Sequence, residues 1–327
     1  MRQPLCIGSL RLATPVLLAP MAGYTDLTFR MAVRRRGGVG LAFSEMISPR
    51  SLLHERGKRI RTLLATCPED SPLGFQLYGS EPDLMADAAK RLVELGAALI
   101  DINMGCPKRK IVRNGSGVSL LTRPEVAVAV ARAVAAAVSV PVTAKIRLGL
   151  KDKTVASGSF LDDLAASGIA ALTVHGRTGE QGYSGRADWE GIREVVERVR
   201  PLTVIGNGDV TSPGAAADLM AAAGCQGIMI GRGALRDPWL PRDAACALAG
   251  EPAPARPARA ERLALMRQHF TDTLATYGSE KGVIIFRKWI PLYARKLSIK
   301  RPDMVLMLRI KDRAGLEKSF DSLAEAG

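Results

Sequence analysis

The sequence predicts an α/β protein, a (β/α)8 TIM barrel followed by a small all-helical domain. Eight short apolar segments alternate with segments of helical periodicity between residues 16 and 230, the pattern of buried parallel strands joined by crossover helices. Polar residues stand where these strands end, and in a barrel the strand ends surround one centre. A doubly wound open sheet is the alternative, but it would not bring so many strand ends together.

The expected strands are short and apolar. They cover residues 16–19, 41–45, 73–77, 99–103, 142–147, 171–175, 202–207 and 227–230. The main helices expected between them cover residues 26–36, 82–95, 124–137, 189–199 and 213–223. In the second of these, Leu84, Ala88, Leu92 and Leu95 repeat at helical spacing.

A proline-rich stretch, residues 251–257, divides the chain and is typical of a linker. Beyond it only helical patterns occur, at residues 259–277, 282–297, 303–309 and 316–326. We therefore expect residues 1–250 to form the barrel and residues 258–327 to form a separate helical domain.

The chain is basic, and its charge is concentrated at one end. Residues 256–327 hold 15 Lys and Arg against 8 Asp and Glu, a net charge of +7, which is half of the +14 of the whole chain. A surface of this kind attracts nucleic acid or an anionic membrane.

Cysteine usage and the N-terminus favour a reducing cytoplasm. The five cysteines show no CxxC spacing and there are three histidines, which argues against a disulfide framework or a metal site such as zinc. The apolar residues 12–23 follow two arginines, as in a signal peptide. Because Pro15 and Pro20 interrupt them, a strand and a loop are the better interpretation.

Cys106 stands just after the fourth strand, between a glycine and a proline, and the basic residues Lys108, Arg109 and Lys110 follow. A single cysteine is more often a small buried hydrophobe than a reactive group. An ordinary thiol is mostly protonated at neutral pH, however, and can serve as a general acid. His175 could act as a base partner if the barrel mouth brings the two together.

Two glycine-rich loops, residues 205–209 and 230–233, follow the last two strands. Backbone N–H groups in such loops can approach an anion, and this is the usual phosphate site of phosphate-binding barrels. No GxGxxG or Walker pattern is present, so a Rossmann-type site is not expected.

Lys145 lies within an apolar strand and should point into the barrel mouth together with Thr143 and Arg147. Its amine could form a Schiff base, as in a lyase acting on a phosphorylated sugar. It could instead donate to an anionic ring atom of a cofactor, or form an ion pair with Asp101. A non-catalytic RNA-binding barrel is a further alternative, because the basic tail carries Trp289 and Tyr293 beside its charges.

Seven short motifs lie in order along nearly the whole chain. They are Ala19-Pro-Met-Ala-Gly-Tyr-Thr-Asp26 with Phe29-Arg30, Gln76-Leu-Tyr-Gly79, Asp101-Ile-Asn-Met-Gly-Cys-Pro107, Lys145-Ile-Arg147, His175-Gly-Arg-Thr178 with Gln181-Gly-Tyr183, Asn207-Gly-Asp209 and Gly231-Arg232. Together they resemble the motifs of the tRNA-dihydrouridine synthases, most closely the bacterial B-type branch. The Asn-x-Gly-Cys-Pro and His-Gly-Arg-Thr motifs are specific, whereas the final Gly-Arg is weak alone.

The resemblance implies an FMN-dependent oxidoreductase that uses NADPH to reduce specific uridines of tRNA to 5,6-dihydrouridine. A flavin hydride would reach C6 of the uracil, and the Cys106 thiol would protonate C5. The residues that the resemblance places against FMN are Pro20, Met21, Ala22, Gln76, Lys145, His175, Asn207, Gly208, Asp209, Gly231 and Arg232.

The same resemblance implies how the substrate is held. Residues expected near the flavin, the uracil or the RNA are Glu45, Asn103, Arg177, Lys108, Arg109, Arg287 and Lys288. The helical domain would grip the tRNA, and the target base would be flipped out of its stack. The family's usual action as a single chain implies a monomer. One departure is Trp289, where a histidine often follows the Arg-Lys pair; it bears on RNA binding.

Overall fold

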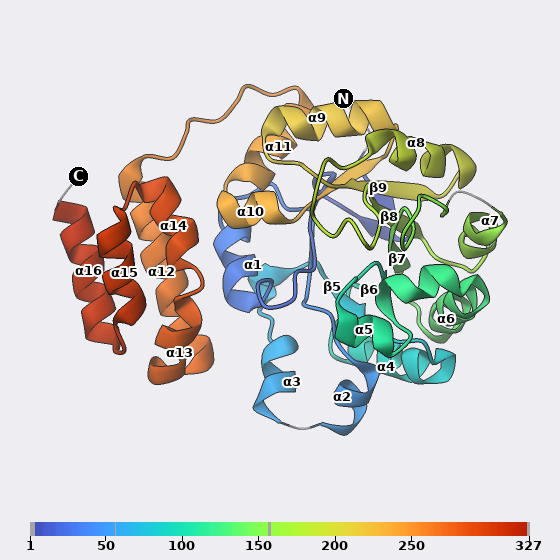
Figure 1. Cartoon of the computed structure of the whole chain (residues 1–327), viewed down its shortest axis with the longest axis horizontal. Helices are drawn as coiled ribbons and strands as arrows, with labels where there is room; N and C mark the ends of the chain where they lie inside the picture. Colours follow the sequence, from blue (N-terminus) through green and yellow to red (C-terminus); the bar gives the residue numbers. More distant parts are fainter. Residues whose placement is uncertain (1–3, 56, 156–157, 326–327) are drawn as a thin grey trace.

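The computed structural model describes residues 4–55, 57–155 and 158–325. Its central feature is a closed barrel of eight parallel strands in the order β10-β3-β4-β5-β6-β7-β8-β9 (Figure 1). The strands are β3 Val16–Leu18, β4 Leu41–Phe43, β5 Leu73–Leu77, β6 Leu99–Met104, β7 Val142–Arg147, β8 Ala171–His175, β9 Thr203–Asn207 and β10 Gly227–Ile230. The predicted barrel is confirmed, and the open sheet is excluded.

The strand register sets which side chains face the barrel interior. Asp101 pairs with Thr143, Asn103 with Lys145, and Arg147 with His175. Because side chains alternate along a strand, these residues share the inner face, while Ile100, Ile102 and Met104 belong to the apolar core outside the barrel. The polar residues of the strand ends therefore converge, as the sequence predicts.

A short antiparallel hairpin, β1 Cys6–Ile7 and β2 Leu10–Arg11, precedes the barrel and was not expected. Its side chains Ile7 and Leu12 join the cluster that fills the barrel interior, together with Leu17 and Phe43. Three expected strands are also shorter than predicted. β3 and β9 lack one residue each, and β4 ends two residues early at Phe43, which leaves Glu45 in the following loop. The hairpin adds apolar side chains to the barrel core.

Helices surround the barrel. They are α1 Leu27–Arg34, α2 Pro49–His54, α3 Lys58–Leu63, α4 Pro82–Glu94, α5 Arg109–Arg113, α6 Pro124–Ala137, α7 Phe160–Ala165, α8 Trp189–Arg198, α9 Pro213–Ala223, α10 Arg232–Arg236 and α11 Leu240–Ala249. The short helices α2, α3, α5 and α7 were not predicted, because helical periodicity needs a longer window to show. None of the described helices is long and apolar enough to cross a membrane.

The tail lies beside α1, and an extended segment without regular secondary structure leads to it (Figure 1). Its helices are α12 Arg259–Tyr277, α13 Ser279–Phe286, α14 Ile290–Leu297, α15 Arg301–Arg309 and α16 Arg313–Glu325. The single helix expected at residues 282–297 is wrong: the chain breaks into α13 and α14 just before Pro291, which has no N–H to continue the ladder. The last helix was expected to reach Ala326, which lies outside the described residues.

Aromatic side chains join the tail to the barrel. Trp289 stacks on Phe29 of α1 with ring centroids 4.8 Å apart and meets His269 of α12 at 4.7 Å. Trp289 is 1% exposed. The expected aromatic RNA-contacting face of this segment is therefore contradicted for Trp289, and Tyr293 is buried as well. The burial of both rings shows that they belong to the core between tail and barrel.

Candidate active site

A cavity of about 690 Å3 opens at the carboxyl ends of the barrel strands. This volume is in the range of about 300–1,000 Å3 that small-molecule and cofactor sites usually have. The predicted site residues that line it are Pro20, Met21, Ala22, Gln76, Asn103, Cys106, Lys108, Lys145, His175, Arg177, Asn207, Gly208, Asp209, Gly231 and Arg232. Among the described residues, no group of three or more His, Cys, Asp or Glu is placed to hold a metal ion.

A chain of hydrogen bonds below the cavity starts at the buried Asp101. Thr143 Oγ1 donates to Asp101 Oδ1 at 2.6 Å, and Gln76 Nε2 donates to Asp101 Oδ2 at 2.7 Å. Asn103 Nδ2 then donates to Gln76 Oε1 at 2.8 Å. Burial raises the pKa of Asp101 to about 6, although the bonds from Thr143 and Gln76 oppose this. Each amide in the chain has one fixed orientation, because its donor and acceptor ends have different partners.

The loop that carries Cys106 is the next link in this chain. Asn103 Oδ1 accepts from the backbone N–H of Cys106 at 2.9 Å and from that of Gly105 at 3.2 Å. Arg147 Nε donates to Gly105 O at 2.8 Å. Val118 N–H donates to Cys106 O at 3.1 Å. These bonds hold the backbone on both sides of the half-buried thiol, which lines the cavity.

Lys145 reaches the cavity from β7, and its Nζ donates to Asn207 Oδ1 at 2.9 Å. Burial lowers its pKa to about 7; Arg147 lowers it further and Asp101 partly opposes the shift. The ion pair with Asp101 that the sequence left open is not formed within the 4.0 Å that defines one. An amine whose pKa lies close to neutral pH can bind an anionic ring atom in its protonated form. In its neutral form it would also suit a Schiff base.

His175 lies on the inner face of β8, close to several cations. Burial lowers its pKa, and Lys145, Arg147 and Arg177 lower it further. The ring is therefore neutral at physiological pH. Arg177 Nη1 lies 3.4 Å from His175 Nε2, so this nitrogen is engaged by the guanidinium.

Asp209 forms ion pairs with the two arginines at the far end of the cavity. Arg177 Nη2 donates to both of its carboxylate oxygens at 2.8 Å, Ala187 N–H donates at 2.7 Å, and Arg232 lies 3.5 Å away. Although burial opposes it, these bonds lower the pKa of Asp209. Two arginines stand around this single carboxylate, and the excess positive charge favours an anionic ligand.

The glycines at this end leave no room for side chains. A Cβ atom at Gly208, whose φ is +127°, would lie 2.7 Å from Ala187 Cβ, and one at Gly233 would lie 2.3 Å from Val210 O. A Cβ atom at Gly231 would touch Met21 Sδ at 3.5 Å in the cavity wall. Bare backbone therefore borders the cavity next to Arg232.

Four predicted site residues do not line the cavity: Glu45, Arg109, Arg287 and Lys288. Glu45 accepts a hydrogen bond from Gly23 N–H. Arg109 is exposed at the start of α5. Arg287 donates to Ile310 O at 2.6 Å within the tail, and Lys288 donates to Gly23 O at 2.6 Å.

The cavity also has lining residues outside the predicted set: Tyr24, Met46, Arg147 and Tyr183. Tyr183 is 60% exposed, and the guanidinium of Arg232 lies 4.4 Å from its ring centroid. Tyr183 and Arg147 stand inside motifs noted in the sequence, and Met46 follows a strand end. The rule that strand ends form the site could have found Met46, and the sequence already placed Arg147 at the barrel mouth beside Lys145.

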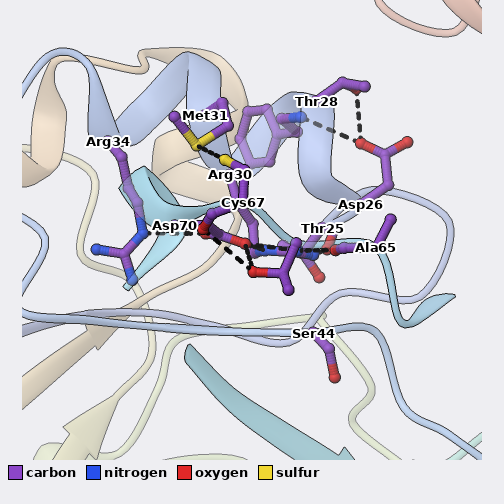
Figure 2. Close-up of polar contacts among 12 residues, drawn as sticks. Thr25, Asp26, Thr28, Arg30, Met31, Arg34, Ser44, Ala65, Cys67 and Asp70 are labelled. Atoms are coloured by element: carbon purple, nitrogen blue, oxygen red, sulfur yellow. Dashed lines mark hydrogen bonds and ion pairs between the residues drawn. The ribbon is translucent and has the colours of Figure 1, made fainter. Parts of the chain in front are cut away.

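The β3–α1 loop, residues 19–26, forms the apolar side of the cavity and is tied down by the buried Arg30. Figure 2 shows this side chain next to Thr25, Ala65 and Asp70. Its guanidinium donates to Asp70 Oδ2 at 2.8 Å, to Thr25 O at 2.7 Å and to Ala65 O at 2.7 Å. Arg30 thus ties the loop to the segment that precedes β5.

Comparison with known proteins decides the family. The model of the family described as Dihydrouridine synthase (Dus) matches residues 17–311. The chain belongs to the dihydrouridine synthase family. It is 38% identical to a probable tRNA-dihydrouridine synthase of Rickettsia conorii over 89% of this chain and 87% of that protein. It is also 38% identical to one of Rhodobacter capsulatus over 94% of each chain.

Solved structures agree on the fold of this dihydrouridine synthase family member. The histamine dehydrogenase of Rhizobium sp. 4-9 superposes with a TM-score of 0.57 at 16% identity, over 82% of this chain and 50% of that one. A morphinone reductase mutant in complex with tetrahydroNAD gives a TM-score of 0.51 at 16% identity, over 76% and 90%. The predicted family and enzyme class are confirmed, and the lyase and the non-catalytic barrel are set aside.

The residues present fit a flavin nucleotide in this dihydrouridine synthase site. Pro20, Met21 and Ala22 offer an apolar wall, and the buried Lys145 amine offers a cation. At the other end, Gly231 would fill cavity space if it carried a side chain, and Arg232 stands beside it. An apolar wall, a buried donor and a bare cationic end match the ring and the phosphate of such a molecule.

Proposed function

We propose that the cavity binds FMN and that the chain reduces specific uridines of tRNA to 5,6-dihydrouridine, with NADPH as the reductant. The observation that carries this proposal is that the Cys106 thiol and the buried Lys145 amine line one cavity in a member of this family. When bound, the flavin supplies the hydride that adds to C6 of the uracil ring.

Cys106 is the general acid. Its S–H bond breaks, the proton forms a C–H bond at C5, and the electron pair remains on sulfur until solvent returns a proton. With the hydride at C6, one molecule of hydrogen has been added across the C5–C6 double bond. The hydrogen bonds that Asn103 accepts and Arg147 donates fix the Cys106 loop. The thiol is therefore in position before the substrate base arrives.

Pro20, Met21 and Ala22 would hold the cofactor ring, and Gln76 and Lys145 would donate to its polar edge. Gln76 uses one amide N–H on Asp101, which leaves its second N–H for the ring. Asn207 positions the Lys145 amine through its Oδ1. His175, which is neutral, lies beside them and adds no charge.

The phosphate end is formed by Gly208, Gly231 and Arg232. Asp209 holds Arg177 and Arg232 through its carboxylate. A carboxylate can only accept, so the contribution of Asp209 to an anion is its backbone N–H and the placement of the two arginines.

The substrate base lies between Asn103 and Arg177, with Lys108 and Arg109 next to the RNA backbone at the cavity mouth. The barrel, residues 1–250, carries the chemistry. Residues 251–257 link it to the helical tail, residues 258–327, which binds tRNA. The chain works as a monomer in the cytoplasm. The excess of positive charge in the tail supports this division, since phosphate contacts dominate RNA affinity.

Purification tests the proposal. The protein should be yellow and show flavin absorbance, and the released cofactor should be identified as FMN by chromatography. Stopped-flow reduction under anaerobic conditions should be faster with NADPH than with NADH. A colourless protein that cannot be loaded with FMN contradicts the proposal.

A further inference from the structure

We infer that Lys288 and Glu45 are positioning residues that together hold the backbone N–H and C=O of Gly23. Through this contact the helical tail fixes one wall of the cofactor cavity. This inference rests on the proposed function, because it takes the cavity to be the flavin site. It assigns to both side chains a task other than contact with uracil or tRNA.

The backbone N–H and C=O of Gly23 are each held by a side chain from another part of the chain. Glu45, which follows β4, accepts from its N–H, and Lys288 Nζ from the tail donates to its C=O at 2.6 Å. Gly23 has a φ of +82°, and nothing lies within 4 Å of a Cβ placed there. The glycine is therefore needed for its backbone conformation. This conformation points the N–H of Gly23 toward Glu45 and its C=O toward Lys288.

Lys288 is already surrounded by barrel partners. Besides Gly23 O, its ammonium lies 3.7 Å from Asp26 Oδ2 and 5.6 Å from the centre of the Tyr24 ring. Asp26 is a well-buried anchor, since Tyr277 from α12 donates to its Oδ2 at 2.8 Å and Thr28 to its Oδ1 at 2.7 Å. The Lys288 side chain is 30% exposed, and its ammonium is engaged by acceptors of the β3–α1 loop.

The held loop is part of the cavity wall. Met21, Ala22 and Tyr24 line the cavity, and the Tyr24 ring meets Trp289 of the tail edge-on at 5.5 Å. Without the Lys288 amine, Gly23 O loses its hydrogen-bond donor, Asp26 loses a cation 3.7 Å away, and the backbone of Gly23 loses one of its two supports. The loop then samples other conformations, and the cavity loses a formed wall before any RNA binds.

Two measurements on the full-length protein without tRNA test the role of Lys288. Lys288→Met keeps the aliphatic stem and should weaken FMN binding at least tenfold. It should also speed hydrogen exchange in peptides that cover residues 19–26. Arg295→Met, which removes an exposed cation of the following helix α14, should leave both unchanged. Wild-type FMN affinity and wild-type exchange in Lys288→Met, with a raised KM for tRNA, would overturn the inference in favour of a plain RNA contact.

Glu45 provides a second test with a conservative rescue. Glu45→Gln retains an oxygen that can accept from Gly23 N–H and should stay within about threefold of wild-type FMN affinity, whereas Glu45→Ala should weaken it about tenfold, the equivalent of ~1.4 kcal/mol. Equal affinities in these two variants would refute the role of Glu45. If the wild type itself binds no FMN, the proposed function fails, and the exchange data still decide whether the loop is held.

Discussion

The two walls of the cavity are built in different ways. On one side, Asn103 and Lys145 project from the neighbouring strands β6 and β7, next to the buried Asp101, and the barrel's own register determines their spacing. On the other side, the β3–α1 loop leaves the strand ladder after Ala19 and is held by Arg30 of α1 and by Lys288 of the tail. The first wall belongs to the barrel alone, whereas the second depends on the tail. Changes in the first should alter the chemistry or the direct bonds to the cofactor, and changes in the second should alter cofactor occupancy through the order of the loop.

The largest effect is expected at the strand-end wall. Cys106→Ala should lower the rate of dihydrouridine formation by ~10²–10⁴-fold, the usual contribution of a general acid. FMN affinity and reduction by NADPH should stay near wild type, because the thiol makes no bond that holds the loop. Single-turnover assays on tRNA measure the first quantity and flavin titration the second. An equal loss in both would show that Cys106 supports the site without acting in the chemistry.

Asp101 allows the strand-end wall to be probed through stability. Its folded pKa of about 6 is above the ordinary value of 3.8. The stabilisation that Asp101 contributes to the free energy of unfolding is therefore fully present below pH 3.8 and lost as pH rises through 6. Relative to Asp101→Asn, the wild type should lose on the order of 3 kcal/mol of unfolding free energy across this window. Urea unfolding from pH 3 to 7 checks it, and parallel curves for the two proteins would contradict it.

Lys145 predicts a pH dependence of cofactor binding. Its pKa in the free protein is about 7, and an anionic partner would raise it in the complex. Affinity is therefore greatest below pH 7 and falls by up to ~10-fold per pH unit above it, until the pKa of the complex is reached. Titrations between pH 7 and 9 should show this slope in wild type and in Lys153→Met, a variant of an exposed lysine paired with Asp188. Lys145→Met should be flat, and a persisting slope would assign the titration to another group.

The smallest effects are expected at the mouth. Lys108→Ala and Arg109→Ala should each reduce the slope of log affinity for tRNA against log salt by about 0.7–0.9, the loss of one phosphate contact. FMN affinity should not change. Lys90→Ala, on the outer helix α4, is the matched control. Unchanged slopes for both mouth variants would remove them from the RNA interface.

The sequence predicted the strand-end wall well because its residues follow from local pattern. Buried parallel strands appear as apolar runs, and the polar residues at their ends must meet. The resemblance named the lining residues of the second wall, Pro20, Met21 and Ala22. The support of this wall by the tail could not be predicted, since Lys288 and Gly23 are 265 residues apart and no periodicity links them. The hairpin strands are two residues long, too short for any alternation to show. The helix break at Pro291, by contrast, could have been predicted from the proline alone.

Mapping dihydrouridine in tRNA is the most direct test of the central claim. In cells that lack this chain, one or more dihydrouridine positions should be lost. The wild-type protein should restore them, and Cys106→Ala, expressed at the same level, should not. An unchanged map in the deletion strain, or full restoration by Cys106→Ala, would contradict the account.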